Sequence, residues 1–275
     1  MAPGLHAASA LLRCASICGT QFPVSNTLSF LRILSSRSCG PVSPSDGVNG
    51  ENVGLLMSLC NGDGLLLKPD KPARSIDAQW IGMLPNAPKG PPGTLWSTHA
   101  TVSNLTWGYV LAAETTANWT ATASMLGLPG TTSGVCWTRP KSQPEGVEPA
   151  ALAVEAFDES HPLSIPATTP AEAHGSVVGV AATPKPYGEQ IWELLYTAPA
   201  LPNGMIMLGE VNKMVPVSTM RFVSIDATAS DSTKVNMVGV MGEVVEVAFL
   251  AHAGGTPTKS SCTMSSDGQC TLVLK

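Results

Sequence analysis

The strongest constraint on the fold is a series of short apolar segments, separated by turns, that begins at Leu95 and continues to Leu274. Segments such as 95–101 and 243–249 alternate apolar and polar residues, as half-buried strands do. Glycine and proline are frequent, at 26 and 23 of 275 residues, whereas charged residues make up only 13%. Roughly ten to twelve short strands joined by turn residues are typical of an antiparallel β-sandwich. The sequence therefore predicts a mainly β domain over residues 94–275.

The expected strands follow one another closely along the chain. They cover 95–101, 106–113, 119–124, 135–137, 152–157, 191–196, 205–211, 235–240, 243–249, 261–264 and 270–274. Residues 161–166 (HPLSIP) are bracketed by prolines and fit only a sheet edge or a loop. Asn203-Gly204, just before one strand, is a strong hairpin signal.

Two further hairpins are expected near the end of the sequence. The first joins 235–240 to 243–249 through Met241-Gly242, and the second joins 261–264 to 270–274. Cys262 and Cys270 flank the turn of the second hairpin, so a disulfide across it and two free thiols are both open interpretations. The sequence has seven cysteines, and the odd number leaves at least one thiol free.

A different kind of segment precedes the strands, at residues 40–77. It starts as a loop with Pro41 and Pro44 and continues as a helix expected over 52–60, with one apolar face. Asn61-Gly62 offers a residue that tolerates positive φ where this helix must stop. Residues 84–93 (LPNAPKGPPG) then form a proline-rich linker.

The order of residues in 40–77 resembles the end of the catalytic barrel in α-galactosidase and raffinose-synthase-like glycoside hydrolases. The matching residues are Gly40, Pro41, Val42, Ser45, Asp46, Asp63, Gly64, Leu66, Leu67, Pro69, Pro72 and Ala73. In those families this segment is the last strand and helix of a (β/α)8 barrel, and an antiparallel β domain follows it. The resemblance implies that residues 39–83 are a remnant strand-helix (βα) unit of such a barrel.

A second block of the sequence is also similar to the β domain of those enzymes. It comprises His161, Pro162, Leu163, Ile165, Pro166, Trp192, Leu194, Tyr196, Ala198, Pro199, Asn203, Gly204, Leu208, Gly209, Glu210, Lys213, Val215, Pro216, Val217, Ser218, Arg221 and Phe222. A complete barrel takes roughly 250 residues, whereas about 75 residues precede the β region here. The resemblance therefore implies the C-terminal part of a glycosidase-like protein, without the strands that carry the catalytic carboxylates.

Residues 1–38 contain no Asp or Glu, and they include three arginines and many Ser and Ala residues. This composition is typical of an organellar targeting segment; a secretory signal and a remnant of barrel sequence are the alternatives. Localisation thus stays open between an organelle and secretion. No window reaches the roughly eighteen apolar residues of a membrane span, so no transmembrane segment is expected. The net charge of −5 argues against a nucleic-acid partner.

Glycoside hydrolysis requires two carboxyl groups on either side of the scissile bond. Asp46 lies in the loop after the expected last barrel strand, on the face where barrel active sites lie, and is the candidate substrate-binding residue. Its alternative role is to cap the following helix. Asp63 is interpreted as a turn residue, and Asp70 and Asp77 as solvated. No pair of carboxylates is predicted to be catalytic.

The sequence was also searched for a catalytic triad and for metal and cofactor motifs. Ser, His and Asp residues are available for a triad, but no G-x-S-x-G motif occurs. No motif for a metal or a cofactor is present, so neither is expected. Glu210 and Lys213 are expected to pair with each other. Five tryptophans are interpreted as core residues rather than as sugar platforms: Trp96, Trp107, Trp119, Trp137 and Trp192.

Two functional hypotheses follow from the sequence. The first is a glycoside-hydrolase-like fragment of carbohydrate metabolism that lacks the catalytic carboxylates. The second is a non-catalytic β-sandwich module that binds carbohydrate or another protein. Carbohydrate is the expected ligand class under both, and a separate barrel portion is an expected partner under the first.

Overall fold

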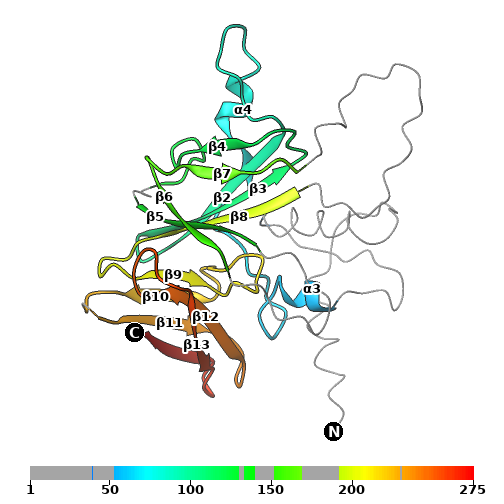
Figure 1. Ribbon diagram of the computed structural model, residues 1–275. Coiled ribbons are helices and arrows are strands. Elements are labelled where there is room, and N and C mark those ends of the chain that lie inside the picture. Colours follow the sequence, from blue (N-terminus) through cyan, green and yellow to red (C-terminus); the bar gives the residue numbers. More distant parts are fainter. Residues whose placement is uncertain (1–38, 40–52, 130–132, 140–151, 169–191, 230) are drawn as a thin grey trace.

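The computed structural model describes residues 39, 53–129, 133–139, 152–168, 192–229 and 231–275 (Figure 1). Within these residues the chain is mainly β, with strands β1–β14 and two short helices, α3 (Val53–Met57) and α4 (Asp77–Ile81). The strand pairings between these elements are antiparallel and form several sheets. The predicted mainly β, sandwich-like fold is therefore confirmed.

A six-stranded sheet forms the centre of the molecule, with the strand order β1-β2-β3-β8-β5-β6. Its strands are β1 (Arg74–Ser75), β2 (Thr94–Val102), β3 (Leu105–Ala113), β8 (Trp192–Pro199), β5 (Ser133–Thr138) and β6 (Val154–Asp158). The central strands β3 and β8 are buried along nearly their whole length. They are therefore apolar on both faces and lose the alternation that marks a half-buried strand.

A thin layer covers one face of the central sheet. It consists of β4 (Trp119–Ala121), β7 (Leu163–Ile165) and the turn 122–128, and we call it the cover layer. Val110 and Ala112 of β3 point toward this layer and join a small apolar core with Leu126 and Leu163. Because the layer is only two strands wide, it leaves room for cavities along its two flanks.

The opposite face of the central sheet packs on two three-stranded sheets that lie below it in Figure 1. One sheet contains β10 (Phe222–Asp226), β11 (Thr233–Val238) and β14 (Gln269–Leu274). The other contains β13 (Thr258–Thr263), β12 (Val244–Leu250) and β9 (Ile206–Gly209). Trp107 and Tyr109 of β3 lie in the large core between these layers, and Trp107 Nε1 donates to the Met207 carbonyl oxygen at 2.8 Å.

The prediction of two C-terminal hairpins is wrong, because neither expected pair of neighbouring strands is paired in a sheet. The tight turn at Met241-Gly242 is present, with Gly242 at φ 80°, but β11 pairs with β10 and β14, whereas β12 pairs with β9 and β13. The chain thus crosses from one sheet to the other at this turn. The apolar pattern identified the strands correctly, but it carries no information about which strand lies beside which.

The disulfide between Cys262 and Cys270 is present, with the Cα atoms 6.4 Å apart. It joins β13 to β14, which belong to different sheets, so it links the two C-terminal sheets rather than the arms of a hairpin. The Asn203-Gly204 signal is confirmed: Gly204 has φ 82°, and the Leu201 amide donates to the Met205 carbonyl oxygen at 2.8 Å across the turn.

The helix expected over 52–60 is observed as the shorter α3. Leu56 and Cys60 are buried as expected, but Val53 is 62% exposed. The positive φ lies at Gly64 (84°) and not at Gly62. The Asn61 side chain accepts from the Leu65 amide at 2.8 Å, which closes a turn around Gly64 instead of ending the helix directly.

The segment 53–77 is attached to the β layers by many hydrogen bonds. Ser218 Oγ donates to the Lys68 carbonyl oxygen at 2.8 Å, and the Lys68 amide donates back to Ser218 Oγ. The Met214 amide donates to the Ser58 carbonyl oxygen at 2.8 Å. Strand β1 extends the central sheet beside β2. The segment is therefore packed as part of the β structure.

Several sequence-based expectations fall outside the described residues. They are the targeting or remnant segment 1–38 and Asp46 in the loop before α3. Among the helices of the described part, none is long and apolar enough to cross a membrane.

Candidate functional site

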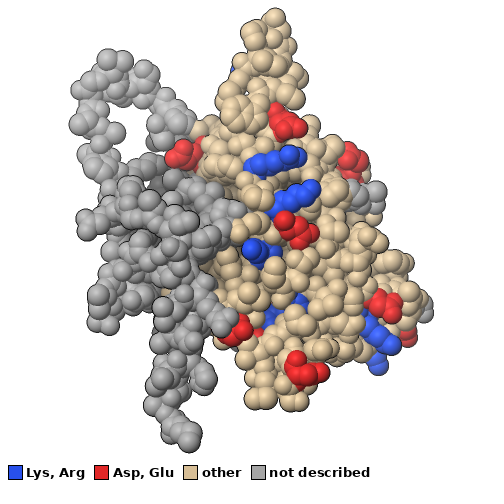
Figure 2. All heavy atoms as spheres, turned by 180° about the vertical axis from the view of Figure 1, so that it is seen from behind, with Lys and Arg blue, Asp and Glu red and all other residues tan. Residues whose placement is uncertain are grey.

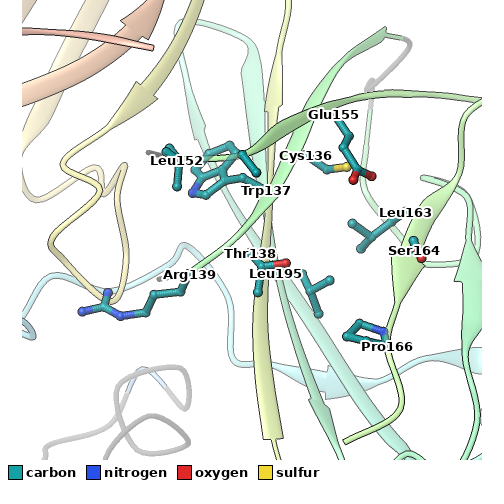
Figure 3. A pocket seen from close by; sticks show the side chains of 11 residues that line it. Cys136, Trp137, Thr138, Arg139, Leu152, Glu155, Leu163, Ser164, Pro166 and Leu195 are labelled. Atoms are coloured by element: carbon teal, nitrogen blue, oxygen red, sulfur yellow. The ribbon is translucent and has the colours of Figure 1, made fainter. Parts of the chain in front are cut away.

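A cavity of about 400 Å³ opens beside β7, on one flank of the cover layer (Figure 3). Strands β5 and β6 form one wall and β7 forms the other, and we call it the β5–β7 cavity. Cys136, Leu163 and Leu195 belong to the apolar core beneath it. Thr138, Glu155 and Ser164 are exposed at its rim. An apolar floor with a few polar groups around it is the usual form of a small-ligand site.

The strand β5 decides which side chains face this cavity, because successive residues of a strand point to opposite sides. Figure 3 shows Cys136 on the side of Glu155 and Leu163, whereas Arg139 points away from them. Arg139 donates to the carbonyl oxygens of Lys213 (2.7 Å) and Asn212 (3.2 Å). Its guanidinium is thus used to anchor the 212–213 loop.

The aromatic side chain of Trp137 is also used elsewhere. It stacks on Tyr196 with ring centroids 5.4 Å apart, in the large core on the opposite face of the sheet. It is only 4% exposed. The β5–β7 cavity therefore lacks an aromatic platform from this residue, and Pro166 is a half-buried ring among its other lining residues.

The thiol of Cys136 is unsuited to nucleophilic chemistry. Burial, followed by the nearby Glu155 carboxylate, raises its pKa to about 12. Since the thiolate is the nucleophilic form of cysteine, the protonated thiol acts here as a small apolar group. Glu155 is the one carboxylate among the described residues that line this cavity.

A second cavity, of about 570 Å³, opens on the other flank of the cover layer. It lies between β1, β2 and the turn 122–129, and we call it the basic cavity because Lys71 and Arg74 line it. The other lining residues are Pro72, Ala73, Ser97, Thr98, His99, Ser124, Gly127, Leu128 and Pro129. The described lining of this cavity includes no carboxylate.

Arg221 is the most highly buried charged group in the described part of the chain, and its side chain is 0% exposed. Its Nε donates to Glu210 at 3.1 Å, and its two terminal nitrogens donate to Glu243 at 2.9 and 2.5 Å. Burial raises the pKa of Glu210 despite Arg221 nearby. Burial opposes ionisation of Glu243 too, but hydrogen bonds from Arg221 and from the Val240 and Gly62 amides hold its pKa below the ordinary value.

These three residues, the Arg221 cluster, have a structural role. Arg221 occupies both carboxylates, Glu210 is buried, Glu243 is 14% exposed, and neither lines the two cavities described above. The expected pairing of Glu210 with Lys213 is seen only as an attraction between their charges, because Lys213 Nζ donates to the carbonyl oxygens of Met57 (2.8 Å) and Cys60 (2.7 Å). Lys213, and Glu243 through its hydrogen bond from the Gly62 amide, thereby tie the segment 53–64 to the C-terminal sheets.

The other described acidic residues weighed from the sequence are not among the residues that line the two cavities. Asp63 is exposed and accepts from the Leu65 amide at 3.1 Å, as expected for a turn residue. Asp70 is exposed but is not simply solvated, because it accepts from the Thr101 amide (2.7 Å) and from Thr219 Oγ (3.2 Å). Asp77 is exposed in the first turn of α4.

One Ser, His and Asp group does come together, in the turn between β6 and β7. Ser160 Oγ and Asp158 Oδ1 both lie 3.0 Å from the same atom, His161 Nδ1. A catalytic triad needs the hydroxyl and the carboxylate on opposite ring nitrogens. Asp158 also accepts from the backbone amides of Ser160 and His161. The arrangement is therefore a turn and not a triad.

The five tryptophans interpreted as core residues are buried or half-buried. The sequence-based interpretation missed Trp80, which is 61% exposed on α4. Ile81, Met83 and Leu84 beside it are also exposed, and α4 projects from the molecule in Figure 1. We call residues 80–84 the apolar tip. Its signal in the sequence was a run of large apolar residues directly before the proline-rich linker.

Among the described residues, no group of three His, Cys, Asp or Glu side chains is arranged to hold a metal ion. No family model matches the sequence, and no curated protein matches it. The resemblance to glycoside hydrolases therefore rests on the short motifs of the sequence alone.

Proposed function

We propose that this chain is a glycoside-hydrolase-like protein that binds carbohydrate in the β5–β7 cavity without hydrolysing it. The observation that carries the proposal is that Glu155 is the single carboxylate among the described residues that line this cavity. Hydrolysis needs two carboxyl groups, about 5 to 9.5 Å apart depending on the stereochemical outcome. One carboxylate beside hydroxyl groups suits binding, since it accepts hydrogen bonds from sugar hydroxyls.

The remaining lining fits a pyranose ring. Pro166 offers an apolar surface for the C–H face of a sugar above the buried Leu163 and Leu195. Thr138 and Ser164 offer hydroxyls at the rim. A volume of about 400 Å³ lies within the range of small-ligand sites. The resemblance to α-galactosidase-like enzymes makes α-galactosides the first ligands to test.

The test is a calorimetric titration of the protein with galactose-containing oligosaccharides, together with an assay of aryl α-galactoside hydrolysis. We expect binding without turnover. Glu155→Gln should weaken binding about tenfold, because a hydrogen bond to a charged acceptor contributes roughly 1.5–3 kcal/mol. Glu159→Gln is the matched control, since Glu159 is an exposed carboxylate outside the cavity lining.

Two results would contradict the proposal. One is hydrolysis that disappears in Glu155→Gln, which would make the cavity catalytic. The other is the absence of binding to every oligosaccharide tested, or binding that Glu155→Gln leaves unchanged.

The apolar tip favours a second candidate function, a protein-interaction module. Four large apolar side chains are 49–69% exposed there, and exposed apolar patches mark interaction sites more often than isolated residues do. A separate barrel portion is the partner that the resemblance implies. Photo-crosslinking from position 83 should capture a partner, and Trp80→Ser should abolish that crosslink. Crosslinking that is indifferent to Trp80→Ser would reject the tip as a docking site.

A further inference from the structure

The basic cavity brings together cations from two neighbouring segments of the chain. Lys71 lies in the extended segment that leads to β1, and Arg74 begins β1 itself. Arg74 Nη2 packs against the turn of the cover layer: a Cβ atom placed on Gly127 would lie 3.4 Å from it. Gly127 has φ 63°, so the turn brings bare backbone next to the guanidinium. Both cations are exposed at the cavity mouth.

Neither Lys71 nor Arg74 forms a salt bridge within the described part of the chain. The salt bridges found there involve Arg221, Lys259 and His161. Asp70 acts on His99 from outside the described lining, and its oxygens accept from Thr101 and Thr219. Its negative charge offsets part of the positive charge, but two cations against one carboxylate leave a net positive charge for a ligand to balance.

The pKa of His99, on the sheet beneath the two cations, is affected by their positive charges. It is half-buried on β2, beside Ser97 on the same face. Burial, with Lys71 and Arg74, lowers its pKa, and Asp70 opposes that shift. The imidazole is therefore neutral at pH 7, and an anion placed beside it would favour the charged form.

The hydroxyl of Ser97 has a fixed direction. Ser97 Oγ donates its hydrogen to the Leu126 carbonyl oxygen at 2.5 Å. Its lone pairs thus remain to accept a hydrogen bond from a ligand hydroxyl. The cavity therefore combines donors for an anion, on Lys71 and Arg74, with an acceptor for a hydroxyl group.

We propose that the basic cavity is a binding site for a phosphate monoester of a small polyhydroxylated molecule. A phosphate monoester carries a charge of about −1.5 to −2 at pH 7, which matches the two cations. Arg binds phosphate through two parallel N–H groups, and Lys binds it as a point charge. The cavity volume of about 570 Å³ leaves space beside the phosphate group for the hydroxylated part of the ligand.

This inference is independent of carbohydrate binding in the β5–β7 cavity, because the two cavities share no lining residue. The experiment is a calorimetric titration of the protein with a hexose 6-phosphate, with the unphosphorylated hexose and with inorganic phosphate. We expect the ester to bind most tightly. Added NaCl should weaken its binding, because exposed charges are screened by salt.

Arg74→Gln and Lys71→Gln should each weaken binding of the ester about tenfold, as expected for the loss of one charge-assisted contact. Lys234→Gln is the matched control, because it removes an exposed positive charge from β11, in a different sheet. The His99 ring signals in NMR should show a pKa that rises when the ester is bound.

Three results would overturn the inference. The first is equal binding of the hexose and its phosphate. The second is an equal loss in Lys234→Gln and in the two cavity variants, or no loss in the latter. The third is equal binding of inorganic phosphate and the ester, which would assign the site to a free anion.

Discussion

Replacing Arg221 with methionine should be among the most damaging single changes in the described part of the chain. The side chain of Arg221 is fully buried and makes hydrogen bonds to Glu210, to both oxygens of Glu243, and to the Val238 carbonyl oxygen at 3.0 Å. Methionine fills similar space but donates to none of them. Two carboxylates would then lie close together in the protein interior without the cation that bonds to both, and Lys213 would be the remaining positive charge that acts on them.

The expected cost follows from this geometry. Breaking a buried ion pair by removing one partner costs roughly 3–5 kcal/mol, because the other charge stays buried and unpaired. Domains are stable by about 5–15 kcal/mol in total. With a urea dependence of about 2 kcal/mol per molar, the unfolding midpoint should fall by roughly 2 M.

Urea unfolding followed by tryptophan fluorescence measures this loss. Arg139→Met is the matched control, since Arg139 donates to two carbonyl oxygens and to no described carboxylate. It should cost about 1 kcal/mol. Adding Glu210→Gln to Arg221→Met should recover part of the loss, because one of the unpaired charges is then removed.

The pH dependence gives a second check. In the wild-type protein the pKa of Glu243 lies below its ordinary value of 4.5, so its contribution to stability is lost as the pH falls below that value. Without Arg221 the pKa values of both carboxylates rise, and protonation then relieves the variant. The difference between wild type and variant should shrink from pH 7 to pH 4. A loss below 1 kcal/mol, or a difference that is independent of pH, would refute the structural role of the cluster.

Two further predictions concern the C-terminal half. Reduction of the Cys262–Cys270 disulfide, which spans 8 residues, should lower the free energy of unfolding by about 2–3 kcal/mol. Dithiothreitol should therefore destabilise the wild type but not a Cys262→Ser, Cys270→Ser double variant. A wild type whose stability is unchanged by dithiothreitol would contradict this prediction. Gly209→Ala should cost at least about 2 kcal/mol more than Gly242→Ala in urea unfolding. Both glycines have positive φ, but a Cβ on Gly209 would lie 2.4 Å from the Pro216 carbonyl oxygen, whereas a Cβ on Gly242 meets nothing within 4 Å. Equal losses would mean that backbone strain alone, and not contact, limits position 209.

Strand positions could be predicted because the pattern of a strand is local. Val245 and Val247 of β12 are buried as their spacing indicated, and the turns at Gly204 and Gly242 have the positive φ that their residues favour. Strand pairing could not be predicted in the same way. Strands β11 and β12 are adjacent in sequence and bury side chains in one core, and the pattern is the same whether they lie side by side or in different sheets.

The candidate sites could not be predicted from local sequence patterns either, because residues that are distant in the sequence form them. Glu210 was expected to pair with Lys213, three residues away, but its partner Arg221 is eleven residues away and reaches it through the fold. Lys71, Arg74 and Glu155 are ordinary surface residue types, and only the packing of the cover layer makes them border cavities. The carboxylate that the resemblance singled out, Asp46, stays a prediction.

The hydrogen bonds of the segment 53–77 set an order for folding. Lys68 bonds to Ser218 across 150 residues, and Gly62 bonds to Glu243 across 181 residues. During synthesis, ribosomes therefore complete most of the chain before the apolar side chains of Leu59 and Leu67 can be covered. Contacts of such long range slow folding and leave intermediates exposed to aggregation. The nascent chain should accordingly depend on chaperones until the last sheet emerges, because only then can Leu59 and Leu67, each 1% exposed in the folded protein, be covered.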